Sequence, residues 1–220
     1  MRKENPIQMD ISVTSFANMG YLELDVPEKL FTLLKKECDT ALVENETFKS
    51  GLTQGIDLYL VGADAGVTSH RYVESVDVLQ ELKNHIFSLI NVYKKQFLFD
   101  PADTRTLTKS LPFSFDKPWI NYQKKFDFVP NHYHQGVFSY TIWMNIPFKN
   151  EGTFAGNFEF TYNSIEGVTR SEIIEPTAGK MILFPSKIFH QVYPFYTSDE
   201  YRISISGNVS LDSEINRVKE

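Results

Sequence analysis

The chain has 220 residues, of which 42% are hydrophobic, and a net charge of −6 at pH 7. This length predicts a single domain with a sizeable core, and the acidic balance argues against nucleic-acid binding, because phosphate contacts need a basic field. No apolar run is long enough for a membrane span, and the N-terminus MRKENPIQMD lacks the apolar segment of a secretory signal. The single cysteine, Cys38, suits a reducing compartment. We therefore expect a cytoplasmic protein that does not contact a membrane.

The first part of the chain, residues 1–100, is predicted to be mainly helical. Residues 27–43 place apolar side chains at helical spacing, with Pro27 in the first turn. Residues 76–98 carry a longer stripe of the same kind, which Ser75 can cap. The apolar positions of this second segment are Val78, Leu79, Leu82, Ile86, Leu89, Ile90, Tyr93 and Phe97. We expect two helices here, of which the second is the longer.

The remainder, residues 112–210, has the pattern of an all-β unit. Pro, Gly and Asn recur at short intervals, and β-branched and aromatic runs lie between them. The predicted strands lie near 118–125, 132–146, 157–162, 171–175, 180–184, 189–194 and 201–209. Strands of this number and length favour a sandwich or a jelly roll. The expected fold class is α+β, with a jelly-roll core at residues 112–210 and the N-terminal helices packed on one sheet, all within a single domain of residues 1–220.

Two of the five histidines lie one residue apart in NHYHQG, residues 131–136. On a strand, alternate side chains share a face, so His132 and His134 would project together and Tyr133 oppositely. Imidazole is a preferred ligand of Fe, Zn, Cu and Ni, and two neighbouring rings can chelate such a metal. The pair by itself is weak evidence, because two half-exposed histidines on a sheet would have the same sequence.

A third histidine follows in AGKMILFPSKIFHQV, residues 178–192. Pro185 ends an apolar strand there, and His190 opens the next strand after a short loop. This position corresponds to the open end of a jelly roll. An ordinary turn histidine would have the same signal, so His190 alone does not identify a site.

An arginine lies on an alternating strand in YRISISGNV, residues 201–209. Strict alternation puts Arg202, Ser204, Ser206 and Asn208 on one face and apolar residues on the other. The polar face either meets solvent, as in many outer strands, or points inward. If it points inward, Arg202 can hold a carboxylate through a bidentate, charge-assisted pair.

Taken together, HYH at residues 132–134, His190 and the Arg-Ile-Ser at residues 202–204 resemble the signature of the Fe(II)/2-oxoglutarate oxygenase superfamily. In that superfamily a His-x-Asp or His-x-Glu pair precedes a distal His and then an Arg, often as Arg-x-Ser. The segments WINYQKKFDFVPNHYHQG and GKMILFPSKIFHQVYP are similar to the prolyl-hydroxylase-like branch, specifically to short bacterial and phage members. The resemblance covers residues 118–209. It implies a double-stranded β-helix, Fe(II) as metal, and 2-oxoglutarate and O2 as co-substrates.

The resemblance also implies roles for individual residues. It makes His132 and His190 iron ligands and Arg202 the partner of the distal carboxylate of 2-oxoglutarate. Ser204 would be a second contact of that carboxylate. The residue ten positions before His132, Tyr122, matches the place from which prolyl-hydroxylase-like enzymes often direct a tyrosine hydroxyl to the same carboxylate. An alternative for that role is Tyr140, on the strand that leaves the histidine pair.

The chain departs from the family at position 134, where a histidine stands in place of the expected Asp. The family's iron is held by two histidines and one carboxylate. Three arrangements are open: a site with His134 as third ligand, a site with water in the third place, and a site whose carboxylate comes from elsewhere. The first is preferred. Among carboxylates Glu159, in NFEFTY, is the first to consider, whereas Asp127 is expected in a turn.

The function implied by the resemblance is hydroxylation of a C–H bond in a protein side chain or a small molecule, with release of succinate and CO2. One alternative is a cupin-like three-histidine metalloenzyme that does not use 2-oxoglutarate. Such an enzyme does not need Arg202, and the glutamate that usually follows its histidine pair is missing from QGVFSYT. The other alternative is a jelly-roll binding module without catalysis, because a fold alone does not determine function.

Overall fold

The computed structural model describes residues 11–15, 20–44, 69–97, 113–150, 152–164 and 166–211. The helices are α1 (Glu28–Glu44) and α2 (Val76–Phe97). The strands are β1 (Ile11–Ser15), β2 (Gly20–Asp25), β3 (Ser69–Tyr72), β4 (Phe113–Phe115), β5 (Trp119–Gln123), β6 (Val129–His132), β7 (Phe138–Asn145), β8 (Phe158–Asn163), β9 (Thr169–Ile174), β10 (Lys180–Pro185), β11 (Phe189–Val192) and β12 (Arg202–Leu211).

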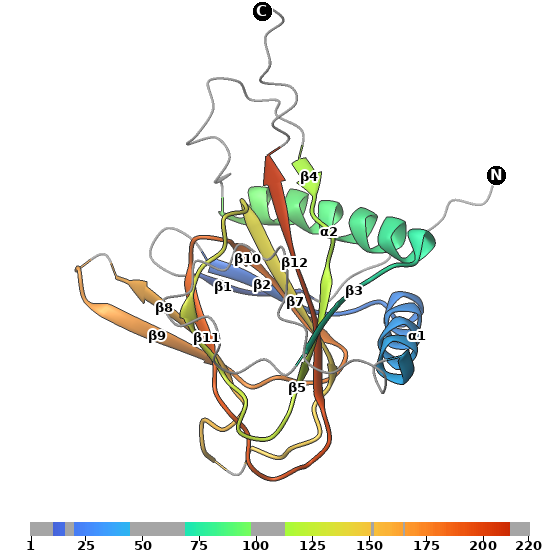
Figure 1. Cartoon of the computed structure of the whole chain (residues 1–220). Coiled ribbons are helices and arrows are strands. Elements are labelled where there is room, and N and C mark those ends of the chain that lie inside the picture. The colour runs from blue at the N-terminus through green and yellow to red at the C-terminus, as the bar shows by residue number, and fades with distance from the viewer. Residues whose placement is uncertain are drawn as a thin grey trace, which may run out of the picture.

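The strands form two sheets. The larger has the order β1-β2-β10-β7-β12-β5-β3, and β4 pairs with β12 beside this path. The smaller has the order β6-β11-β8-β9. All pairs are antiparallel. The predicted α+β jelly roll is confirmed, with β8 and β9 extending away from the large sheet in Figure 1.

Both helices cover one face of the larger sheet, as Figure 1 shows. The stripe of α2 is buried as its spacing predicts, and Leu82, Ile86 and Leu89 have no exposed surface. The stripe of α1 meets the same core through Leu30, Leu34 and Cys38. The two predicted helices and their packing on one sheet are therefore confirmed.

Alternation along the central strands separates two environments. On β12, Ile203, Ile205 and Val209 belong to the core shared with the helices. The intervening residues, beginning with Arg202 and Ser204, face the smaller sheet, because successive side chains of a strand point to opposite faces. The strands β5 and β7 are sorted in the same way, and their helix-facing residues are Ile120, Tyr122, Phe138, Tyr140, Ile142 and Met144.

Two features of the strands differ from the expectation. The strands β1 to β4 were not predicted. β2 lies inside the larger sheet between β1 and β10, and its alternation, with Leu22 and Leu24 buried and Asp25 exposed, extends over only a few residues. The predicted strand at residues 132–146 is wrong in its first part: β6 ends at His132, a crossing segment follows, and β7, which lies in the other sheet, begins at Phe138. The crossing passes Gly136, where a Cβ would lie 2.9 Å from the Ser186 hydroxyl and 3.0 Å from the Val209 carbonyl oxygen.

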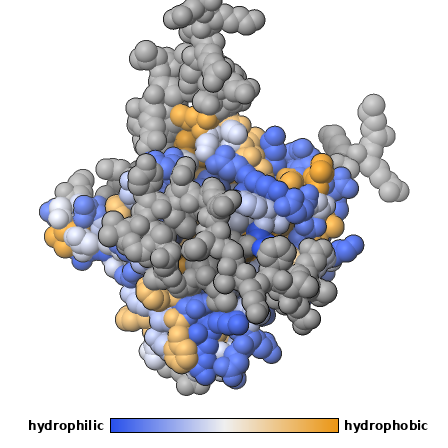
Figure 2. Space-filling model, in the orientation of Figure 1, coloured by the Kyte–Doolittle hydropathy of each residue, from blue (hydrophilic) through white to orange (hydrophobic). Residues whose placement is uncertain are grey.

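Where Figure 2 shows the described residues, the surface is mainly hydrophilic, and its apolar residues form small separate patches. Neither of the described helices is long and apolar enough to cross a membrane.

Candidate metal and co-substrate site

Three histidines meet at one end of the space between the two sheets. His132 is the last residue of β6, and His190 is its direct partner on β11. His134 lies in the crossing segment, where its backbone N–H donates to the Ser186 carbonyl at 2.9 Å. The spacing predicted His132 and His134 on one strand; in the structure the second imidazole is positioned by the crossing segment instead.

The three imidazoles have the spacing of a metal-ligand set. Their ring centroids are 4.3 Å apart for His132 and His190, 5.0 Å for His132 and His134, and 5.1 Å for His134 and His190. One nitrogen from each ring can be chosen so that all three lie within 4.8 Å of one another. Among the described residues, this group contains no carboxylate.

Backbone hydrogen bonds orient two of the rings. His132 Nδ1 lies 2.8 Å from the Pro130 carbonyl oxygen, and His190 Nδ1 lies 3.0 Å from the Ile188 carbonyl oxygen. A carbonyl oxygen can only accept, so each Nδ1 carries the hydrogen and each Nε2 keeps its lone pair. A backbone carbonyl on the second ring nitrogen is the usual support of a metal-bound histidine.

Burial keeps the three rings neutral. Burial lowers the pKa of His132, and burial followed by the two neighbouring histidines lowers the pKa of His190 well below its ordinary value. Burial, then His132 and Lys187, lowers the pKa of His134 to about 3. Only a neutral imidazole can coordinate a metal, so these rings are competent ligands at neutral pH.

Aromatic side chains enclose the histidines. The Phe158 ring stacks on His190 with centroids 5.3 Å apart, and the Phe184 ring meets the same imidazole edge-on at 5.0 Å. The Trp119 ring lies 5.9 Å from His134. These contacts hold the imidazoles in place and keep bulk water away from them.

The buried arginine lies on the same inter-sheet face. Arg202 is 2% exposed, and one of its terminal nitrogens, Nη1, donates to the Gly156 carbonyl at 3.0 Å. Its Nε has no hydrogen-bond partner, and none of the carboxylates in the described residues pairs with it. Burial lowers its pKa to about 9, so the guanidinium is still charged at neutral pH. An uncompensated buried charge is costly, and a guanidinium with a donor left over is able to bind an anion.

A band of small polar side chains continues from the arginine along the same face. The Asn121 amide donates to the hydroxyls of Ser204 at 3.3 Å and Ser206 at 3.2 Å. Because the Ser204 oxygen accepts this bond, its own hydroxyl hydrogen is left to donate elsewhere. Ser204 thus has a hydroxyl hydrogen able to donate on the same face of β12 as Arg202.

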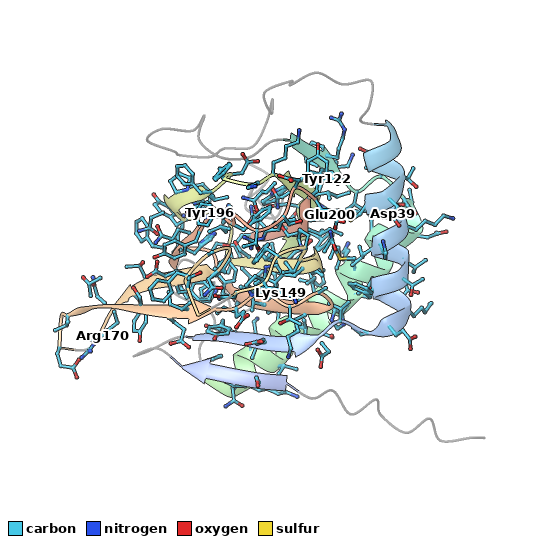
Figure 3. The ribbon with its side chains drawn as sticks, turned by 90° about the horizontal axis from the view of Figure 1, so that it is seen from below. Asp39, Tyr122, Lys149, Arg170, Tyr196 and Glu200 are labelled. Carbon is cyan, nitrogen blue, oxygen red and sulfur yellow. The ribbon has the colours of Figure 1, made fainter. Side chains whose placement is uncertain are left out.

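The two tyrosines proposed for the same anion point the other way. The Tyr122 hydroxyl donates to the Cys38 carbonyl of α1 at 2.8 Å, and Figure 3 shows this residue toward the helix that bears Asp39. Tyr140 packs in the same helix-facing core, and its hydroxyl has no partner. Both assignments are corrected: alternation puts each tyrosine on the face of its strand opposite to Arg202.

These two hydroxyls allow a matched test of the assignment. Changing Tyr122→Phe removes a buried hydrogen bond between β5 and α1 and is expected to cost about 1 kcal/mol of unfolding free energy. Changing Tyr140→Phe removes a buried hydroxyl without a partner and is expected to be neutral or to stabilise by up to about 1 kcal/mol. Urea unfolding of both variants measures the difference, and equal losses would contradict the hydrogen-bond assignment.

The carboxylates considered as iron ligands do not reach the histidines. Glu159 lies on the other face of β8 from Phe158, where it accepts hydrogen bonds from the Tyr193 hydroxyl at 2.6 Å and from the Gln191 amide. Burial raises its pKa, but hydrogen bonds from Ser171, Tyr193 and Gln191 outweigh this and leave the pKa lowered. Asp127 accepts the Lys124 backbone N–H at 2.7 Å in the turn between β5 and β6, as expected.

The comparisons with known proteins agree with this geometry. Residues 117–208 match the family model described as putative 2OG-Fe(II) oxygenase. These residues belong to the 2-oxoglutarate- and Fe(II)-dependent oxygenase superfamily. The matched region contains the three histidines and Arg202, and the family expected from the sequence is confirmed. No curated protein sequence matches the chain.

Solved structures share the oxygenase fold at low sequence identity. A Pseudomonas putida prolyl-4-hydroxylase has a TM-score of 0.57 and 16% identity, over 90% of this chain and 95% of that one. A Trichoplax adhaerens prolyl hydroxylase, solved with a hypoxia inducible factor peptide fragment, has a TM-score of 0.58 and 14% identity, over 90% and 85%. The epimerase SnoN of nogalamycin biosynthesis has a TM-score of 0.52 and 13% identity, over 89% and 80%.

The residues of this site fit the metal and the co-substrate of that superfamily. Three neutral imidazoles, two of them with Nε2 free for coordination, suit Fe(II). The Arg202 Nε is a buried donor that lacks a partner, as expected where an anionic co-substrate completes the site.

One inward-facing residue of the site was missed by sequence reasoning. Gln123 lies directly opposite Arg202 in the pairing of β5 with β12 and is 3% exposed. The resemblance directed attention to its neighbour Tyr122. The alternation in WINYQ, which puts Trp119, Asn121 and Gln123 on one face, could have identified it.

Proposed function

We propose that this oxygenase uses Fe(II), 2-oxoglutarate and O2 to hydroxylate a C–H bond of a protein side chain or a small molecule. His132, His134 and His190 hold the iron, and Arg202 with Ser204 holds the distal carboxylate of 2-oxoglutarate. The observation that carries the proposal is the buried guanidinium without a carboxylate partner among the described residues, on the same inter-sheet face as three neutral imidazoles. We also propose the cytoplasm as its location, since its one cysteine is unpaired and buried.

When held by His132, His134 and His190, iron would supply the redox chemistry of the coupled reaction in which R–H, O2 and 2-oxoglutarate become R–OH, succinate and CO2. The protein's residues bind and orient. The carbonyls of Pro130 and Ile188 hold His132 and His190 in the ring orientation that presents Nε2. The guanidinium of Arg202 fixes the far end of the co-substrate, so the reacting end meets the metal in a defined geometry. No side chain acts as a general base in this scheme.

The ligand set gives the site a charge that favours an anionic co-substrate. Three neutral imidazoles leave the full charge of a divalent cation uncompensated, whereas the family's carboxylate would remove one unit. Arg202 adds a further positive charge on the same face. In a site screened from water by Phe158, Phe184 and Trp119, these charges attract the two carboxylates of 2-oxoglutarate more strongly than they would in solvent.

The two alternative functions account for less of the site. A cupin-like enzyme without 2-oxoglutarate would use the three histidines but would leave Arg202 buried with no anion to bind. A binding module without catalysis would need neither the neutral imidazoles with oriented Nε2 atoms nor the arginine. The family match over residues 117–208 also supports the oxygenase.

The proposal predicts a visible signal before any substrate is known. Anaerobic addition of Fe(II) and then 2-oxoglutarate is expected to produce the metal-to-ligand charge-transfer absorption of a chelated 2-oxo acid. With O2 and ascorbate, slow uncoupled turnover of labelled 2-oxoglutarate should yield labelled succinate. A protein that binds Fe(II) but gives neither the absorption nor succinate would support the cupin-like alternative. A protein that binds no metal would support the binding module.

A further inference from the structure

Gln123 is a buried polar residue that no part of the mechanism above uses. It is the last residue of β5, is 3% exposed, and its amide nitrogen Nε2 has no hydrogen-bond partner. A buried amide without a partner costs on the order of 1–3 kcal/mol, so a native structure keeps one only where something else satisfies it.

The strand register brings this amide to the arginine. Gln123 is the direct cross-strand partner of Arg202, and directly opposite residues have Cβ atoms roughly 4.5–5.5 Å apart. Both side chains project from the same face, because Tyr122 and Ile203, the adjacent pair in this register, both lie in the helix-facing core. Gln123 Nε2 and Arg202 Nε are therefore two neighbouring buried donors, each without an acceptor among the described residues.

Two donors side by side match the two oxygens of one carboxylate. A guanidinium engages a carboxylate through parallel N–H bonds, and an amide NH2 beside it can reach the second oxygen. Tyr122, the residue expected to assist Arg202, bonds to the Cys38 carbonyl on the other side of the sheet. Gln123, the next residue in the sequence, supplies an amide on the face of the sheet that carries Arg202.

We infer that Gln123 donates a hydrogen bond to the distal carboxylate of the 2-oxo acid co-substrate, beside Arg202, in the place where a tyrosine hydroxyl was expected. The inference rests on the proposed function. It has one further consequence: a carboxylate at position 123 would satisfy Arg202 from within the chain and would exclude the co-substrate.

The test compares two ligands that differ in the distal carboxylate. Affinities of 2-oxoglutarate and of 2-oxobutyrate, which lacks that carboxylate, are measured calorimetrically with Mn(II) in place of Fe(II). Gln123→Leu is expected to weaken 2-oxoglutarate by about tenfold or more and to leave 2-oxobutyrate unchanged. Gln191→Leu is the matched control: Gln191 points to Glu159 on the outer face of the smaller sheet, so this variant should bind both ligands as the parent does.

Gln123→Glu provides a second test of the role of Gln123 if Gln123→Leu folds poorly. Gln123→Glu is expected to raise the melting temperature of the ligand-free protein, since the new carboxylate pairs with Arg202, and to weaken 2-oxoglutarate by more than about 100-fold. A lowered melting temperature in Gln123→Glu, or unchanged 2-oxoglutarate affinity in either variant, would overturn the role of Gln123. Failure of the parent protein to bind 2-oxoglutarate would instead overturn the proposed function.

Discussion

Replacing His190 by alanine is expected to reduce the affinity for Fe(II) by more than about 100-fold, because it removes a ligand that the surrounding residues hold in place. His190 lies at the centre of the site: it pairs with His132 across two strands and stacks on Phe158. Equilibrium dialysis of the chelator-treated protein with Fe(II) or Mn(II) measures the affinity. His190→Gln, which retains most of the side-chain volume, separates the loss of the ligand from the loss of packing.

A matched control for the metal prediction is present in the chain. His85 on α2 is also partly buried, and burial lowers its pKa, but it belongs to the helix and not to the histidine cluster. His85→Ala should leave the metal affinity unchanged. An equal loss in His85→Ala and His190→Ala would show that the effect comes from general destabilisation.

Two variants of His134 distinguish the possible ligand sets. If its ring is the third ligand, His134→Ala should lower the metal affinity by about tenfold or more. His134→Asp, which restores the family's carboxylate, should retain the metal and shift the charge-transfer absorption by changing the charge of the site. An unchanged affinity in His134→Ala would favour two histidines with water in the third place.

Replacing Arg202 by methionine is expected to weaken 2-oxoglutarate binding by about 100-fold or more while leaving metal affinity intact, because an anion in this enclosed site would lose its charged partner. The same change should not lower the stability of the ligand-free protein and is expected to raise it by about 1 kcal/mol or more. The reason is that it removes a buried charge whose carboxylate partner is absent from the described residues. Calorimetric titration and urea unfolding measure the two effects.

The opposite signs of these effects make the Arg202 test specific. If Arg202 had only a structural role, its replacement would lower the stability of the protein. If it binds the co-substrate, its replacement lowers the affinity for 2-oxoglutarate. Tyr122→Phe is the control from the opposite face of the same sheet, where the Tyr122 hydroxyl bonds to α1: this variant should lose about 1 kcal/mol of stability and bind 2-oxoglutarate normally. Unchanged 2-oxoglutarate affinity in Arg202→Met would favour the cupin-like alternative.

The features that the sequence predicted correctly depend on local periodicity or on a linear signature. The stripes of α1 and α2 repeat at helical spacing over many turns, so their buried faces could be identified without the fold. The grouping of His132, His134 and His190 followed from the family signature. The alternation of residues 201–209 correctly put Arg202 and Ser204 on one face but could not say what that face meets.

The strand predictions that failed depended on which sheet a segment joins. Residues 132–146 have one continuous β pattern, yet the chain leaves β6 at His132 and joins the other sheet at β7, because Gly136 allows a close passage beside Ser186 and Val209. The alternation of apolar and polar residues by which strands are predicted does not indicate where a chain crosses from one sheet to the other. The strands β1 to β3 were missed because they are short; in addition, β2 pairs with β10 and β3 with β5, which lie far away in the sequence.

The sequence by itself determined the fold class, the three metal-binding candidates and the arginine, since each is encoded by residue type and spacing. Only the tertiary structure decided which of two adjacent residues on β5 lies on the same face of the sheet as Arg202. Tyr122 and Gln123 are adjacent, and a strand sends adjacent side chains to opposite faces, so one of them must point toward α1 and the other toward the histidines. The packing of α1 on the larger sheet covers the face that carries Tyr122 and leaves the face that carries Gln123 toward the smaller sheet. This packing is a property of the whole fold.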